Sequence, residues 1–338
     1  MRGVMVPLEK IKIEPLGAES LGVRSFCLYV ETPDISILID PSVALAPRRD
    51  GYRPHLREIA AAKFSRDLIS ERAKKCTILT ISHYHFDHYT TSLNRIYQWT
   101  NEKIAKELYD GKIILAKDRS HKSSINYSQK KRSYYLYKRK DCEIRPADGQ
   151  SFQFGQTTIR FSEPVWHGSE GTKLGWVLMT TVEYGDEKIL HASDVQGPMS
   201  AHTLSLIEDE RPNILLIGGP PTYLQQVSQE DLEYGIANLK KLASFIGVIV
   251  VDHHLLRDEK WKEHLKNVYA TAKKNDNQIY CIAEFMELSP LLLEVQRKEL
   301  YKKEPLDNSF HDKLFRMNSE ILEIIESTKN ALKEKLTL

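Results

Sequence analysis

Short apolar runs separated by polar turns fill the first part of the chain. The runs at 11–13, 25–32 and 35–39 are rich in β-branched and other apolar residues, as strands are, and the turn dipeptide Pro33-Asp34 separates the last two. A further run of this kind, 76–82, leads into a group of histidines. The pattern predicts two or three strands before residue 40 and another strand directly before residue 83.

A helical period replaces the strand pattern elsewhere. Helices are predicted at 56–75, 230–242 and 260–273, where apolar residues recur every three or four positions. Strand-like runs return in the second half, at 151–154, 157–161, 176–184, 188–191, 214–217 and 245–251. Strands that alternate with helices are typical of a layered α/β fold, and polar residues follow the ends of several of these runs.

The last part of the chain is predicted to be a charged helical tail. Helices are expected at 293–301 and 310–336, with Pro305 between them. Apolar residues recur at roughly heptad spacing along the tail, at Leu314, Ile321, Ile325 and Leu332. This stripe could dock on the same chain, which we favour, or form the seam of a homodimer. We therefore expect one domain over 1–290 and a helical tail over 291–338.

Composition and charge narrow the class of protein. Hydrophobic residues make up 41% of the 338, enough for a sizeable core, and the net charge of +2 argues against a polyanion-binding surface over the whole molecule. Residues 1–16 contain no long apolar stretch, so we expect no signal peptide or membrane anchor and a cytoplasmic location. The four cysteines form no C-x-x-C pair, which argues against a cysteine zinc site or a disulfide framework.

One segment departs from this balance of charge. Residues 112–140 hold ten Lys or Arg against one acidic residue, and tyrosines are interleaved with them. Cations beside aromatic rings suit contact with phosphates and stacking of bases, so this basic insertion could bind nucleic acid. It could equally be a solvated amphipathic helix whose tyrosines pack on the core.

The sequence His83-x-His85-x-Asp87-His88 follows the run 76–82 directly. Side chains two apart in an extended segment point the same way, so His83 and His85 can bind one metal ion, while Asp87 and His88 can bind a second from the following turn. Imidazole and carboxylate groups suit Zn²⁺, Fe and Mn²⁺, and two such ions about 3.5–4 Å apart can hold a bridging hydroxide. Without a metal, each of these packed polar groups would need another partner.

This motif and the strand before it resemble the metallo-β-lactamase superfamily. Three further segments, 19–25, 39–41 and 252–258, resemble a mostly archaeal branch of predicted metal-dependent hydrolases, and the resemblance covers roughly residues 10–290. It implies an α/β fold in four layers, an αββα sandwich with a dinuclear metal site at one edge, here followed by a C-terminal helical extension.

The resemblance also implies a set of metal ligands. They are His83, His85, Asp87, His88, His167, Asp194 and His254. In the superfamily pattern His167 completes the set begun by the first two histidines. Asp194 bridges the two ions, because a carboxylate has two oxygens.

Two positions near this site stay open in the sequence. The third ligand of the ion held by Asp87 and His88 should be a histidine after the last strand, where His253 and His254 both stand, and the family spacing favours His254. Asp40 stands where an aspartate of the resembled family orients a metal ligand without binding the metal, or it only caps its turn.

These residues predict a metal-dependent hydrolase with two divalent metal ions, expected to be Zn²⁺ with Fe or Mn as alternatives. A bridging hydroxide would attack the substrate. Asp194 would hold the ions together, and Asp87, or Asp252 beside the site, would move a proton to the leaving group. Asp87 and Asp194 are thus the predicted catalytic carboxylates.

The expected substrate is a phosphodiester or another phosphorylated, nucleotide-like small molecule, because 112–140, Arg48, Arg49 and Arg53 are basic. A hydrolase of an ester, thioester or lactone is the first alternative. A nucleic-acid-binding protein whose metal site is structural is the second.

Overall fold

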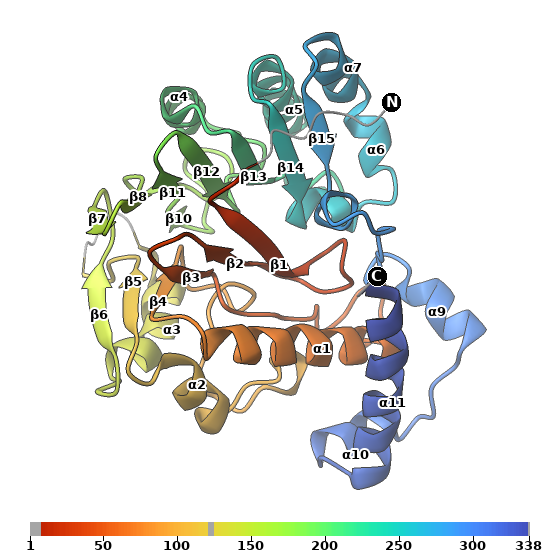
Figure 1. The fold of residues 1–338 in the computed structure, drawn as a ribbon. Coiled ribbons are helices and arrows are strands. Elements are labelled where there is room, and N and C mark those ends of the chain that lie inside the picture. Colours follow the sequence, from red (N-terminus) through yellow and green to blue (C-terminus); the bar gives the residue numbers. More distant parts are fainter. Residues whose placement is uncertain (1–7, 121–124, 337–338) are drawn as a thin grey trace.

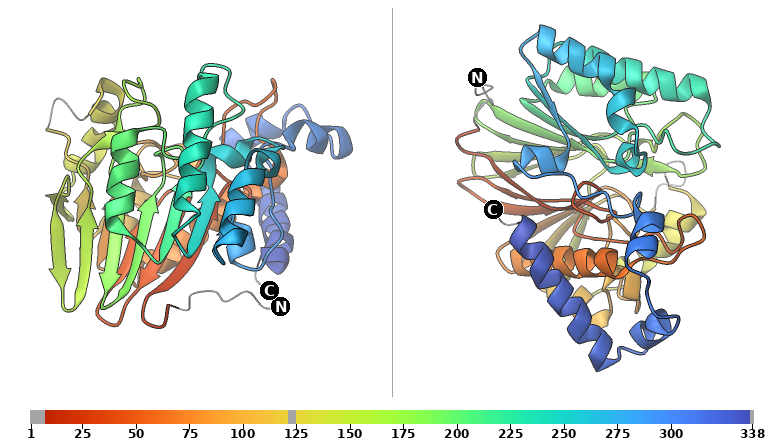
Figure 2. Two further views of the ribbon diagram at one scale, coloured as in Figure 1. Left: turned by 90° about the horizontal axis from the view of Figure 1, so that it is seen from above. Right: turned by 90° about the vertical axis from the view of Figure 1, so that its right-hand side faces the viewer.

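Two β-sheets packed face to face form the centre of the molecule (Figure 1). The structure is a computed structural model, and it describes residues 8–120 and 125–336. Figure 2 shows the layers edge-on, with helices outside each sheet. This is the metallo-β-lactamase-like αββα sandwich expected from the sequence, with helices added at the C-terminal end.

The first sheet has six strands in the order β1-β2-β3-β4-β5-β6. They are β1 (Lys12–Ala18), β2 (Phe26–Glu31), β3 (Ser36–Ile39), β4 (Ile78–Ile81), β5 (Ile113–Ala116) and β6 (Glu143–Pro146). The strands β1 to β3 are antiparallel neighbours, whereas β3 to β6 run parallel. Because β3 and β4 are parallel and adjacent, the residues that follow them lie at the same edge of the sheet.

The second sheet has seven strands in the order β15-β14-β13-β12-β11-β8-β7. They are β7 (Ser151–Phe154), β8 (Thr157–Phe161), β11 (Thr180–Tyr184), β12 (Glu187–Ala192), β13 (Ile214–Gly218), β14 (Val248–Asp252) and β15 (Gln278–Tyr280), while β9 (Val165–Trp166) and β10 (Trp176–Val177) pair separately. The strands β12 to β15 run parallel, so the chain leaves β12 and β14 at one edge.

Helices cover the outer faces of both sheets (Figures 1 and 2). On the side of the first sheet lie α1 (Leu56–Ala73), η1 (Ile96–Gln98), α2 (Glu102–Tyr109) and α3 (Tyr127–Tyr137). On the side of the second lie α4 (Ala201–Glu210), α5 (Gln229–Leu242), α6 (Trp261–His264) and α7 (Lys266–Lys274). The remaining helices are η2 (His253–Arg257), α8 (Ile282–Phe285), α9 (Arg297–Lys303), α10 (Phe310–Phe315) and α11 (Ser319–Leu336).

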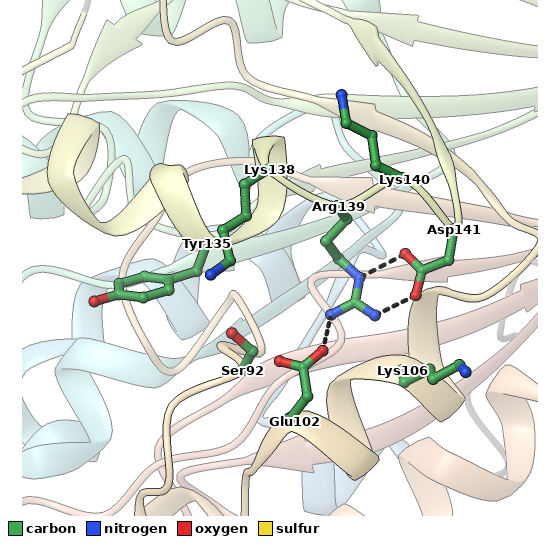
Figure 3. A pocket seen from close by; sticks show the side chains of 8 residues that line it. All are labelled: Ser92, Glu102, Lys106, Tyr135, Lys138, Arg139, Lys140 and Asp141. Atoms are coloured by element: carbon green, nitrogen blue, oxygen red, sulfur yellow. Dashed lines mark hydrogen bonds and ion pairs between the residues drawn. The ribbon is translucent and has the colours of Figure 1, made fainter.

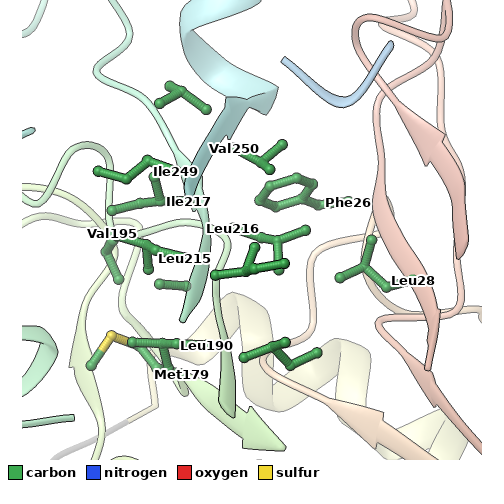
Figure 4. Packing of buried hydrophobic residues seen from close by; sticks show 14 of the residues in the cluster. Phe26, Leu28, Met179, Leu190, Val195, Leu215, Leu216, Ile217, Ile249 and Val250 are labelled. Carbon is green, nitrogen blue, oxygen red and sulfur yellow. The ribbon is translucent and has the colours of Figure 1, made fainter. Parts of the chain in front are cut away.

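The main hydrophobic core fills the space between the sheets (Figure 4). Phe26 and Leu28 of β2 belong to this core, whereas Cys27 and Tyr29 belong to a second cluster with α1, because side chains alternate between the two faces of a strand. Strands β13 and β14 are buried along their whole length, which explains why both appear in the sequence as unbroken apolar runs. No helix of the described residues is both long and apolar enough to cross a membrane.

The basic segment 112–140 is divided between the first sheet and a helix. Its start forms β5, and residues 121–124 lie outside the described residues. Helix α3 buries Gln129, Ser133 and Leu136, whereas Tyr127 and Tyr134 are 83% and 52% exposed. The helix is therefore amphipathic, but its exposed face carries tyrosines as well as cations.

The apolar stripe of the tail packs on the same chain. Its residues Leu314, Ile321, Ile325 and Leu332 are buried in the cluster that includes Ile59 and Ile69 of α1. Lys329 of α11 also donates a hydrogen bond to Asp67 of α1 at 2.9 Å. The stripe thus docks within the chain, and a homodimer through this helix stays a prediction.

Two ion pairs join the tail to the N-terminal half. Arg297 of α9 donates to both carboxylate oxygens of Glu58 in α1, at 2.7 and 2.8 Å, and both side chains are 0% exposed. Glu58 also accepts the N–H of His55 at 2.8 Å, in the capping box that begins α1. Arg24 donates to both oxygens of Glu294 at 2.6 Å. The tail is therefore held by buried charges as well as by apolar packing.

Candidate metal centre

Polar residues that follow four strands converge at one edge of the sandwich. His83 to His88 follow β4, His167 follows β9, Asp194 follows β12, and His253 and His254 follow β14. The groups whose candidate ligand atoms lie within 4.8 Å of one another are His83, His85 and His167; Asp87, His88 and His253; His167, Asp194 and His254; and Asp40, His83 and His88. All seven side chains predicted from the sequence therefore meet here.

Asp194 lies between the two halves of this cluster. Its Oδ2 is 3.0 Å from His88 Nε2, and its Oδ1 is 3.0 Å from His167 Nε2. Each oxygen thus faces a histidine of a different group. A carboxylate that bridges two metal ions requires this placement.

The cluster contains buried atoms that would suit a metal ion. Within the described part of the chain, His83 Nε2, His167 Nε2 and Asp194 Oδ2 are buried and make no hydrogen bond. Buried polar atoms without partners destabilise a fold, so such a group of atoms needs an explanation. Imidazole nitrogens and a carboxylate oxygen are donors that divalent transition metals prefer, and the cluster therefore fits them.

The electrostatics of the cluster keep several donors in the form that binds metal. Burial lowers the pKa of His83 well below its usual range and that of His85 to about 3, so both imidazoles are neutral. Burial would raise the pKa of Asp87, but the nearby His88 and His253 outweigh it and lower that pKa. Neutral imidazoles and ionised carboxylates are what metal binding requires.

The structure places His253, rather than His254, beside Asp87 and His88. His253 Nε2 lies 3.2 Å from His88 Nε2 and 3.7 Å from Asp87 Oδ2. His254 Nε2 instead lies 3.4 Å from Asp194 Oδ1, in the group with His167. The physical reason is the backbone: His253 has φ +63°, a left-handed conformation that turns the chain at once after β14. Residue spacing assumes a continued strand and misses this turn.

Asp40 orients the histidine at the end of the motif. Its Oδ2 accepts from His88 Nδ1 at 3.0 Å and from Ser82 Oγ at 2.6 Å, and its Oδ1 accepts from Ser82 N at 2.8 Å. Ser82 Oγ also lies 2.9 Å from His83 Nδ1. With the His88 proton held on Nδ1, Nε2 is left free as a ligand.

Sequence analysis gave Glu19 and Arg257 no role, although both lie beside the cluster. Glu19 Oε2 accepts from His253 Nδ1 at 2.7 Å, and Glu19 Oε1 accepts from Arg257 Nε at 2.6 Å. The Arg257 guanidinium reaches to 3.7 Å from Asp87 Oδ2. Glu19 therefore orients His253 as Asp40 orients His88. No local pattern could show this, because Glu19 and His253 are 234 residues apart.

Asp252 has a different role from the proton transfer considered for it. Its Oδ1 accepts from the backbone N–H of His253 at 2.7 Å and of Ser20 at 3.3 Å, and its Oδ2 accepts from Ile282 N at 2.9 Å. Both oxygens thus hold backbone segments around the end of β14. The predicted proton-transfer role is therefore better suited to Asp87, whose side chain is 18% exposed.

A separate cavity of about 470 Å³ lies beside α3 (Figure 3). It is lined by Ser92, Glu102, Lys106, Tyr135, Lys138, Arg139, Lys140 and Asp141, none of which belongs to the metal cluster. Figure 3 shows Arg139 paired with both acidic side chains, Asp141 and Glu102. The Lys138 ammonium lies 5.8 Å from the Tyr135 ring. This cavity holds part of the basic segment but is not part of the candidate centre.

Solved structures similar to this chain include metallo-β-lactamase fold proteins. YhfI from Bacillus subtilis, described as a metallo-β-lactamase fold protein, is 12% identical with a TM-score of 0.48, covering 81% of this chain and 97% of that one. A metallo hydrolase from the archaeon Ignicoccus hospitalis is 12% identical with a TM-score of 0.43, covering 81% and 95%.

Sequence comparison gives nearer relatives, although no family model matches the chain. A UPF0282 protein of Methanopyrus kandleri is 42% identical over 299 residues, which cover 87% of this chain and 100% of the relative. A UPF0282 protein of Methanocaldococcus jannaschii is 42% identical over 307 residues, which cover 89% and 100%. A UPF0282 protein of Pyrococcus horikoshii is 41% identical over 298 residues, which cover 87% and 94%.

Proposed function

The chain belongs to the UPF0282 family, and we propose that it is a metal-dependent hydrolase acting on a phosphodiester or phosphorylated substrate. The observation that carries the proposal is the cluster of histidines and aspartates at the edge of the sandwich, with its buried atoms that lack hydrogen-bond partners. Such a donor set, at the end of strands and near the surface, suits metal-assisted hydrolysis.

Two divalent ions would be held by two groups of side chains. The proposed ligands of the first are His83, His85 and His167, those of the second are Asp87, His88 and His253, and Asp194 is shared. His254 stays the alternative to His253, as the sequence predicted. Zn²⁺ is the expected metal, with Fe or Mn as alternatives. When bound, such ions stabilise negative charge and activate a water molecule as the nucleophile.

The side chains of the protein have separate tasks in this proposal. Asp40 and Glu19 fix the ring orientation of His88 and His253 by accepting from Nδ1. Asp87, ionised and at the partly exposed side of the cluster, is placed to accept a proton and pass it to the leaving group. Because ligand geometry is fixed before the substrate arrives, little reorganisation is needed during the reaction.

The charges near the cluster support a phosphate ester over a neutral ester. The Arg257 guanidinium adjoins Asp87, and Arg49 donates to the Arg257 carbonyl at 2.9 Å. Of the other arginines that the sequence suggested, Arg53 lies within 4.0 Å of Asp312 in the tail, away from this group. Cations beside the site favour anionic substrates by attraction, so KM should rise with ionic strength.

Two alternatives are kept because observations favour each in part. A hydrolase of an ester, thioester or lactone would use the same cluster but would not respond to ionic strength. A nucleic-acid-binding protein with a structural metal site is favoured by the exposed rings of Tyr127 and Tyr134 on basic α3. Salt-dependent nucleic-acid binding without turnover would support that second alternative.

The experiment that tests the proposal measures metal content and turnover together. Protein purified without chelator is analysed by mass spectrometry for bound metal, and hydrolysis of a chromogenic bis-phosphodiester is followed before and after the metal is stripped. We expect two ions per chain and metal-dependent turnover. His85→Ala should lower kcat/KM on the order of 10³-fold, whereas His202→Ala, a matched change at an exposed histidine, should not. Failure of the protein to bind metal would overturn the proposal.

A further inference from the structure

Two arginines lie against the ring of Phe86, which stands inside the metal motif between His85 and Asp87. The Arg95 guanidinium carbon is 4.0 Å from the ring centroid, and that of Arg132 is 4.7 Å away. Both distances are within the range of a cation–π contact. Two positive side chains from separate elements are thus gathered on one half-buried ring at the edge of the metal cluster.

Neither arginine has an acidic partner. Among the described residues, Arg95 and Arg132 form no ion pair with a carboxylate, and their guanidinium groups donate no hydrogen bond to any of those residues. This contrasts with Arg24, Arg257 and Arg297, each of which is paired with a glutamate. Two guanidinium groups on one ring repel each other, and an anion placed between them would remove that repulsion.

Both arginines are presented by ordered backbone. Arg95 N donates to Thr100 O at 3.0 Å and Thr100 N donates to Arg95 O at 3.2 Å, which fixes the loop around η1. Arg132 stands on α3, which Gln129 and neighbouring residues anchor in the interior. A pair of cations held in place beforehand loses little freedom when it binds an anion, so the arrangement suits recognition.

The position of Phe86 separates the pair from the metal ligands. His85 and Asp87 contribute to the cluster, and the side chain between them points to another side because successive side chains alternate in an extended segment. The arginines therefore lie beside the reacting group of a bound substrate and reach a part of it next to the scissile bond. Asp87 raises and Arg95 lowers the pKa of Arg132, which agrees with this placement.

We propose that Arg95 and Arg132 bind a second anionic group of the substrate, a phosphate or carboxylate that is not cleaved. This inference rests on the proposed hydrolase function and narrows it: the substrate is a phosphate ester that carries another negative charge close to the bond broken. Arginine suits this task because its planar group can donate two parallel hydrogen bonds to one oxyanion.

The first test compares two chromogenic phosphodiesters with the metal-loaded protein. One has two uncharged arms, and the other carries a phosphate or, in a separate arm of the experiment, a carboxylate on the arm that does not leave. For Arg132→Gln and Arg95→Gln, KM for the charged substrates should rise about tenfold more than KM for the uncharged one, as expected for one lost charge-assisted hydrogen bond. Equal changes for both kinds of substrate would overturn the inference.

Arg119→Gln is the matched control for these variants. Arg119 also lies on an aromatic ring, 5.3 Å from the centroid of Tyr137, and belongs to the same basic segment, but it does not contact Phe86. It should leave the ratio of the two KM values unchanged. Circular dichroism and thermal melting of each variant show that the fold is retained.

The second test needs no turnover and separates the two proposals. Pyrophosphate binding to the full chain is measured by calorimetry in the presence of a chelator. The double variant Arg95→Gln/Arg132→Gln should weaken binding at least tenfold, and Arg119→Gln should not. If pyrophosphate binds as predicted while no phosphodiester is hydrolysed, the proposed function fails and the anion site stands. If pyrophosphate does not bind, or binds the double variant equally well, the anion site is wrong.

Discussion

Replacing Asp40 by Asn should weaken metal binding without unfolding the protein. Asp40 has φ +47°, a left-handed conformation that Asn adopts more readily than most residues, and the two side chains are nearly equal in size. The variant therefore keeps the backbone and changes one acceptor into a donor. Asn Nδ2 cannot face the N–H of Ser82, so it must take the place of Oδ2, which accepts from His88 Nδ1.

The magnitude follows from that exchange. An amide donor facing Nδ1 makes this nitrogen the acceptor and moves the His88 proton to Nε2, the atom that would bind the metal. Regaining the correct tautomer costs one charge-assisted hydrogen bond, about 1.5–3 kcal/mol, which corresponds to a loss of affinity of about 10- to 150-fold. Loss of an orienting partner of a metal ligand generally costs about 10- to 100-fold, in agreement.

The assay is competition with a chelator of known affinity, with the number of bound ions measured by mass spectrometry. For Asp40→Asn, one of the two ions should be lost at a chelator concentration at which the wild type keeps both. Asp34→Asn is the control, because Asp34 also accepts backbone N–H bonds, from Gln156 and Thr157, but lies outside the cluster. If Asp40→Asn retains both ions with wild-type affinity, the proposed orienting role of this carboxylate is wrong.

Three further predictions concern the stability of the whole fold. Arg297→Met should lower the free energy of unfolding in urea by about 3–5 kcal/mol, because it leaves the buried Glu58 carboxylate unpaired, and Glu58→Gln/Arg297→Met should recover part of that loss; no recovery would contradict a direct pairing energy. Burial, and secondarily Arg53, lowers the pKa of His311 to about 4. As pH falls from about 6.5 to 4, the unfolded chain takes up a proton that the folded chain does not, so stability should fall by about 1–2 kcal/mol in that window; His311→Gln should remove this dependence, and an unchanged slope would refute it. Removal of bound metal should lower the melting temperature, by an amount that grows with the free-metal concentration used for comparison, and identical melting curves would show that the cluster holds no metal.

The sequence predicted best where one physical pattern dominates. Apolar runs correctly gave the buried strands β13 and β14, and the spacing of the motif after β4 brought its histidines and aspartate to one place. Polar edge strands were missed: β6 has no buried residue and carries Glu143 and Arg145, so nothing in its composition distinguishes it from a loop. The helix predicted at 260–273 is divided into α6 and α7 at Leu265.

The parts of the site that the sequence could not show depend on single dihedral angles and on distant contacts. The left-handed turn at His253 decides which of two adjacent histidines meets Asp87, and residue spacing does not contain that angle. Glu19 reaches His253 only because two sheets pack face to face. The guanidinium pair on Phe86 likewise joins a loop and a helix whose contact is fixed by the complete fold.

The Glu58–Arg297 ion pair also has a consequence for synthesis of the chain. The two residues are 239 positions apart, and ribosomes add about 5–20 residues per second, so Glu58 leaves the ribosome roughly 10–50 s before Arg297. During that time α1 cannot bury its carboxylate at low cost, because an unpaired charge in the interior is strongly destabilising. The N-terminal sheet and α1 should therefore reach their final packing only when nearly the whole chain has been made, and the C-terminal helices complete the folding of the protein.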